Sequence, residues 1–252
     1  MNKISLEFNI ATAEEMTSTL IMFLHNNDQT SIQIAKMLNL NYIEWKTKPN
    51  DIQYQMVREK TEIIYKKIES KMLTGLKNLQ IVWQQEQSKI EQSFKSAFGK
   101  FKDQKCLTSI TFNYVIYPRY LKEKTFDIWY NFNKYEFLLT ALNEITHFIW
   151  FDKLKSLMPK IKRNEYEYPS PVWLFSEIAV DQIFETQEYF KNIAKNSSQT
   201  PAYKRFYSDK IGDETIIEHF RKLFSNCNNI DEFIIKGTND CIDLYSKNLI
   251  KS

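Results

Sequence analysis

Three strongly polar side chains, Asn143, Glu144 and His147, interrupt an otherwise apolar stretch between residues 137 and 151. Burying such groups costs free energy unless they pair with one another or bind a ligand. Positions 143 and 147 are one helical turn apart, so their side chains project from the same face of a helix, with Glu144 beside them. This spacing is typical of a helix that contributes to a metal site.

A second apolar segment, residues 173–181, carries two acidic side chains at helical spacing. Glu177 and Asp181 are again one turn apart and share a face of the predicted helix. This second segment therefore repeats the one-turn spacing of polar side chains found in the first.

Together the two segments resemble the zincin metallopeptidases of the glutamate-zincin type. The sequence NEITH at 143–147 matches their HExxH motif at each defined position except the first, where Asn143 replaces histidine. SEIAVD at 176–181 resembles the helix that carries the third metal ligand of that family. The resemblance covers about residues 107–195. It implies that His147 and Glu177 bind a metal ion, and that Asp181 holds a metal-binding residue in orientation.

The resemblance also implies a reaction. A bound zinc ion, or another divalent cation, acidifies its water, and Glu144 accepts the proton as the water attacks the carbonyl of a peptide or protein substrate. Tyr207 and His219 are candidates for stabilising the negative oxygen that forms, and Tyr203 and Arg205 are further possible donors. The expected activity is that of a metal-dependent peptidase or hydrolase.

Asn143 is the departure from the family pattern. An amide oxygen is a neutral and weaker zinc ligand than imidazole, which favours a harder metal or no metal at all. As a ligand, Asn143 would donate from its amide nitrogen to the carboxylate of Asp181. Two alternatives to the enzyme stay open: a catalytically inactive zincin-like protein, and a helical module that binds other proteins through the helices of residues 50–98.

The elements that must position these residues give an α+β fold that is predominantly helical, because glycine and proline are few and helix-forming residues dominate. We expect a helical N-terminal subdomain over residues 1–100 and a zincin-like core with a helical C-terminal part over 101–252. A glycine, Gly75, is expected to interrupt the helical pattern of residues 50–98. The remaining predicted elements are strands at 1–10, 107–118 and 125–129 and helices at 12–25, 30–37, 136–157, 172–193 and from 215 onward.

In the resemblance to zincins, the strand at 107–118 takes the place of the edge strand that pairs with an extended substrate.

Composition excludes several other classes of protein. The net charge of +3 arises from 34 basic and 31 acidic residues that are interspersed, so no basic stripe predicts nucleic-acid binding. The N-terminal residues do not resemble a secretory signal, and no apolar run is long enough to span a bilayer. Three separated cysteines are typical of a reducing compartment. We therefore expect a cytoplasmic protein without a membrane partner.

Overall fold

A computed structural model describes residues 2–26 and 28–251 and shows a predominantly helical α+β protein with a small sheet, as predicted. The chain divides into two compact units. One unit contains residues up to 5, 85–104 and 135–252, and the other contains residues 6–84 and 105–134. This division differs from the boundary expected near residue 100, because the long helix α4 (Asn50–Phe98) contributes residues to both units.

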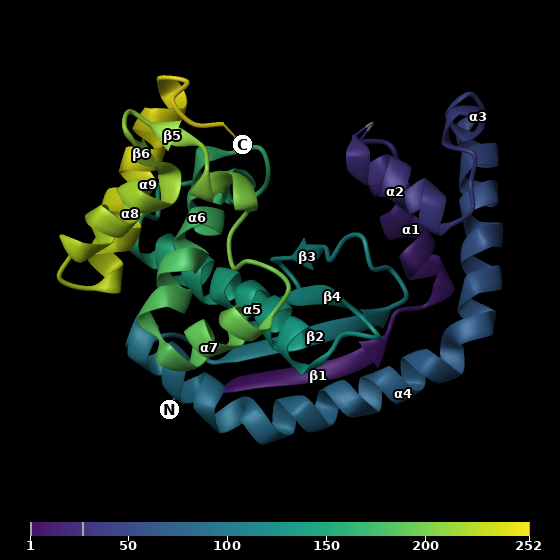
Figure 1. Ribbon diagram of the computed structural model, residues 1–252, viewed down its shortest axis with the longest axis horizontal. Coiled ribbons are helices and arrows are strands. Elements are labelled where there is room, and N and C mark those ends of the chain that lie inside the picture. Colours follow the sequence, from purple (N-terminus) through teal and green to yellow (C-terminus); the bar gives the residue numbers. More distant parts are fainter. Residues whose placement is uncertain (1, 27, 252) are drawn as a thin grey trace. The chain divides into compact units, whose positions relative to one another are not determined.

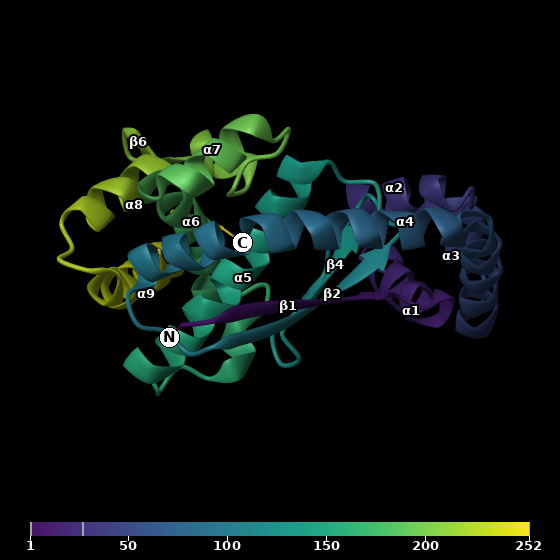
Figure 2. The same cartoon turned by 90° about the horizontal axis from the view of Figure 1, so that it is seen from below.

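The four-stranded sheet has the order β1-β2-β4-β3, formed by β1 (Ile4–Ile10), β2 (Gln104–Thr111), β4 (Thr125–Trp129) and β3 (Arg119–Tyr120) (Figure 1). Strand β2 runs parallel to β4, and β3 runs antiparallel to it. Figure 2 shows β1, β2 and β4 side by side. The prediction that the strand at 107–118 is an edge strand is wrong, because β1 and β4 flank the observed strand β2 on its two sides.

One face of this sheet is a buried, mostly apolar layer. Strand β2 alternates in burial, and its buried residues Thr108 and Ile110 are in register with Phe126 and Ile128 of β4. Side chains of neighbouring strands in register project to the same side, so these residues form one apolar layer. The opposite face carries Asp127, which is in register with Ser109 of β2.

The helices of the same unit are α1 (Ala13–Leu24), α2 (Gln29–Met37), α3 (Tyr42–Lys46) and the first part of α4. Thr12 and Glu15 form a capping box that begins α1, which confirms the predicted start of this helix. The expected interruption at Gly75 is wrong, since α4 continues through it. A Cβ atom at position 75 would lie 2.2 Å from the carbonyl oxygen of Tyr130, so this glycine permits close packing.

The other unit is built from the helices α5 (Lys134–Leu157), α6 (Pro171–Thr186), α7 (Glu188–Asn196), α8 (Ile216–Ser225) and α9 (Ile230–Ser246). Two 3₁₀ turns, η1 (Arg163–Tyr166) and η2 (Lys204–Tyr207), and a short hairpin of β5 (Lys210–Ile211) and β6 (Glu214–Thr215) complete it. The single helix expected at 172–193 is two helices, because Gln187 has extended backbone angles. In the part of the chain that the structure describes, no helix has the length and apolarity needed to cross a membrane.

Aromatic packing fixes α5 and α6 in the centre of this unit. The ring of Phe175 on α6 lies 5.3 Å from the ring of Trp150 on α5 and 5.3 Å from that of Phe233 on α9, measured between centroids. Gly237 on α9 gives this ring its space, because a Cβ atom there would lie 2.0 Å from Phe175. The two helices that carry the candidate site residues are therefore rigidly held.

Candidate functional site

The predicted motif helix is confirmed as α5, which buries nearly all side chains from Phe137 to Phe151. Its polar residues are buried with them: His147 is fully buried, and Glu144 is 8% exposed. Helix α6 is buried from Val172 to Phe184 in the same way, and Glu177 on it is also 8% exposed. Ser170 begins α6 by accepting hydrogen bonds from two backbone amides of its first turn, and Pro171 follows at the first helical position.

The structure brings His147 and Glu177 together. The Nε2 atom of His147 lies 3.5 Å from the Oε2 atom of Glu177. Neither ring nitrogen of His147 has a hydrogen-bond partner among the described residues, although the side chain is fully buried. The ring lies against that of Phe151, with 6.3 Å between centroids. Burying an imidazole without hydrogen-bond partners costs free energy, and a ligand bound beside His147 and Glu177 would offset that cost.

The His147–Glu177 pair has a separation suited to a shared metal ion. Ligand atoms at about 2.0–2.2 Å from a tetrahedral zinc ion lie roughly 3.3–3.6 Å from each other. Among residues 2–26 and 28–251, however, no three His, Cys, Asp or Glu side chains gather in a way that could hold a metal ion. A metal ion bound by His147 and Glu177 would therefore need a third ligand of another residue type.

Asn143 has a partner other than the one expected. Its amide nitrogen donates to the carbonyl oxygen of Pro201 at 2.7 Å, in the segment that follows α7. The predicted hydrogen bond from this amide to the carboxylate of Asp181 is wrong, because Tyr207 and Arg221 bind that carboxylate instead. The carbonyl oxygen of the Asn143 side chain remains the candidate third ligand.

Asp181 is held by residues that come later in the chain. Arg221 on α8 donates to both carboxylate oxygens, at 3.0 and 3.1 Å, and the hydroxyl of Tyr207 donates to one of them at 2.7 Å. Burial raises the pKa of the Asp181 carboxyl, and the contacts with Tyr207 and Arg221 oppose that rise. Burial and the neighbouring carboxylate raise the pKa of Tyr207. The sequence did not predict that Arg221 belongs to this cluster, because the position of an arginine on an amphipathic helix does not indicate which carboxylate it binds.

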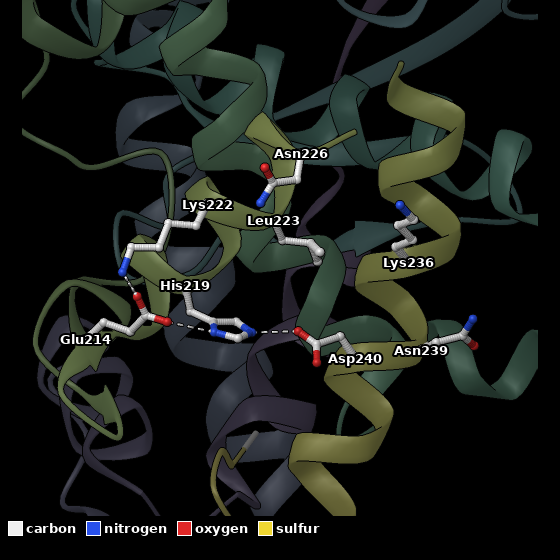
Figure 3. Close-up of a pocket in the computed structure, with 8 residues that line it drawn as sticks. All are labelled: Glu214, His219, Lys222, Leu223, Asn226, Lys236, Asn239 and Asp240. Atoms are coloured by element: carbon white, nitrogen blue, oxygen red, sulfur yellow. Dashed lines mark hydrogen bonds and ion pairs between the residues drawn. The ribbon is translucent and has the colours of Figure 1, made fainter. Parts of the chain in front are cut away.

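His219 lies on α8 but faces away from Asp181. Positions 219 and 221 are separated by about 200° around a helix, so their side chains project to nearly opposite sides. The Nδ1 atom of His219 lies 3.0 Å from Glu214 and the Nε2 atom lies 2.6 Å from Asp240 on α9. Figure 3 shows these contacts among the residues that line a pocket. The volume of this pocket is about 520 Å³. The structure does not bring His219 to the side of α8 that contacts α6.

The two further candidate donors lie near the beginning of η2. The ring of Tyr203 lies 6.2 Å from that of Trp173, between centroids, and Tyr203 is 50% exposed. The guanidinium of Arg205 lies over the ring of Phe206, 5.0 Å from its centroid. Of these contacts, the one made by Tyr203 reaches α6, and Tyr207 at the end of η2 donates a hydrogen bond to the predicted site residue Asp181.

Comparisons with known protein families, with curated proteins and with solved structures find no match to this chain.

Proposed function

We propose that this protein is a zincin-like, metal-dependent hydrolase whose divalent cation is bound by His147 and Glu177. The observation that carries the proposal is the fully buried imidazole of His147, which lacks hydrogen-bond partners and lies 3.5 Å from Glu177. Two ligand types that zinc prefers thus converge from neighbouring helices at a suitable separation. The side-chain oxygen of Asn143, one turn before His147, is the proposed third ligand.

A cation held by His147, Glu177 and Asn143 would supply Lewis-acid chemistry, which lowers the pKa of bound water. Glu144, next to Asn143 on α5, would be the group that accepts a proton. Its burial beside an apolar core excludes bulk water from the reacting atoms. The proposed substrate is a peptide or protein, whose amide carbonyl is the group attacked.

Asp181 has a different role from the one that the resemblance implies. Its carboxylate binds Tyr207 and Arg221, so it fixes the segment around η2 and the helix α8 against α6. Because Asp181 is one turn after Glu177, this anchoring determines the surroundings of the proposed metal ligand. The hydroxyl proton of Tyr207 is already used in this contact, which makes Tyr207 a positioning residue in the proposal.

A metal titration tests the proposal. Calorimetric titration of the metal-free protein with Zn²⁺ and with Mn²⁺ should show one site, and His147→Ala should abolish it. His25→Ala is the matched control, because His25 lies at the end of α1 in the other unit and should leave binding unchanged. Equal metal binding by the parent and His147→Ala would refute the site.

A second candidate function is favoured by the hydrogen bond between Asn143 and Pro201, which uses the side chain that replaces the family's first histidine. In that case the protein is an inactive zincin-like protein that binds a partner protein. Peptide hydrolysis that is lost in Glu144→Gln while metal binding persists would support the hydrolase. Metal binding that appears only in Asn143→His, without hydrolysis by the parent, would support the inactive form.

A further inference from the structure

The segment between α7 and η2, residues 197–203, lies next to the proposed site. It contains no regular secondary structure, and most of its residues are exposed. Three contacts tie it to α5 and α6. Pro201 accepts a hydrogen bond from Asn143, Ser198 donates to Glu136 at 2.8 Å, and the ring of Tyr203 lies against that of Trp173.

The anchor points of this segment coincide with the ligand-bearing faces of both helices. Asn143 is one turn before His147 on α5, and Trp173 is one turn before Glu177 on α6. Residues four positions apart share a helix face. The segment therefore bridges the two helices beside the atoms that would bind the cation.

The continuation of the chain contacts the same face of α6 at two points. Residues 173, 177 and 181 follow one another at intervals of four along α6, and Tyr207 is bonded to Asp181 at the far end of this row. Tyr203 contacts the near end, so the contacts of Tyr203 and Tyr207 lie on either side of Glu177 along the helix. Phe206, which is fully buried, fixes this part of the chain.

We propose that residues 197–203 form a lid over the His147–Glu177 site, that the lid turns about the fixed Phe206, and that the Asn143 side chain latches it closed. This lid depends on the proposed function in one respect, namely that the His147–Glu177 site binds a ligand. The asparagine at position 143 supplies the latch, because its amide nitrogen donates to the Pro201 carbonyl. A segment with few buried apolar contacts is also one that opens at low cost.

Hydrogen exchange of the metal-free protein tests the latch without reference to metal. Asn143→Asp keeps the shape of the side chain but removes the N–H donor, so exchange of the amides in residues 198–203 should become at least about tenfold faster. Asn192→Asp is the matched control, because it makes the same chemical change on an exposed position of α7 and should leave lid exchange unchanged. Unchanged exchange in Asn143→Asp would overturn the latch.

Chemical labelling of histidine tests whether the lid controls access. The variant Ser198→Ala/Tyr203→Ala weakens the lid from its own side and leaves the site residues intact. Diethyl pyrocarbonate should modify His147 several-fold faster in this variant, with the modification of His25 as the internal reference. Equal labelling of His147 in the variant and the parent would refute the lid, whereas a failed metal titration with faster labelling would refute only the metal site.

Discussion

Asp127 on β4 is a buried carboxyl group whose protonation should control the stability of the sheet-containing unit. It is 8% exposed, and burial together with the charge of Glu15 on α1 raises its pKa from 3.8 to about 7. Tyr120 on β3 lies close enough for the Asp127 charge to raise the pKa of its hydroxyl, although burial is the larger cause. Thr19, one turn after Glu15, is 3.2 Å from the Tyr120 hydroxyl, so α1 packs at this place.

The magnitude follows from the linkage between proton binding and folding. The unfolded chain loses the Asp127 proton near pH 4, whereas the folded chain keeps it until about pH 7. The favourable contribution of the protonated form is therefore complete below pH 4 and is lost as the pH rises toward 7. A shift of about three pKa units corresponds to roughly 4 kcal/mol.

Asp127→Asn replaces the carboxyl by a neutral group of the same shape and should remove this dependence. Urea unfolding of parent and variant from pH 4 to 8.5 should give equal stabilities near pH 4. At pH 8 the variant should be more stable, by up to roughly 4 kcal/mol. Glu123→Gln, an exposed carboxylate in the turn before β4, is the control and should change stability by less than about 0.5 kcal/mol at each pH.

A difference between Asp127→Asn and the parent that stays constant from pH 4 to 8.5 would contradict the reasoning. It would mean that the carboxyl ionises in the folded protein as it does in the unfolded chain, with Glu15 too distant or too well solvated to matter.

Three further outcomes are expected. Gly237→Ala should lower the free energy of unfolding by about 1–3 kcal/mol, because the added Cβ atom would overlap the ring of Phe175. Thermal unfolding measures this effect, and an unchanged midpoint temperature would contradict it. Arg221→Met should lower the free energy of unfolding by about 1–3 kcal/mol at pH 8 and by less at pH 4, because the buried carboxylate of Asp181 loses its cation. An equal loss at both pH values in urea unfolding would exclude this cause. Of the three cysteines, only Cys227 should react with a thiol reagent in the folded protein, because the other two are buried; rapid reaction of all three without denaturant would show that the core opens.

The sequence determined most of the regular elements, because their signals are local. An apolar run from residue 137 to 151 with helix-forming residues and no proline predicts α5, and the Thr12–Glu15 capping box predicts the start of α1. Such patterns act over one or two turns, where backbone hydrogen bonds and side-chain spacing decide the conformation. They also identified His147 as a polar residue of a buried helix in need of a partner, whereas Glu177 was identified through the resemblance to zincins.

Only the tertiary structure decided which partners these and other residues have. Asn143 bonds Pro201, 58 positions away, and Asp181 bonds Arg221, 40 positions away. The place of β2 in the middle of the sheet depends on β1, whose sequence lies far from it in the chain. Periodicity specifies which face of an element is buried but not which distant segment covers it, because that choice depends on the packing of the whole unit.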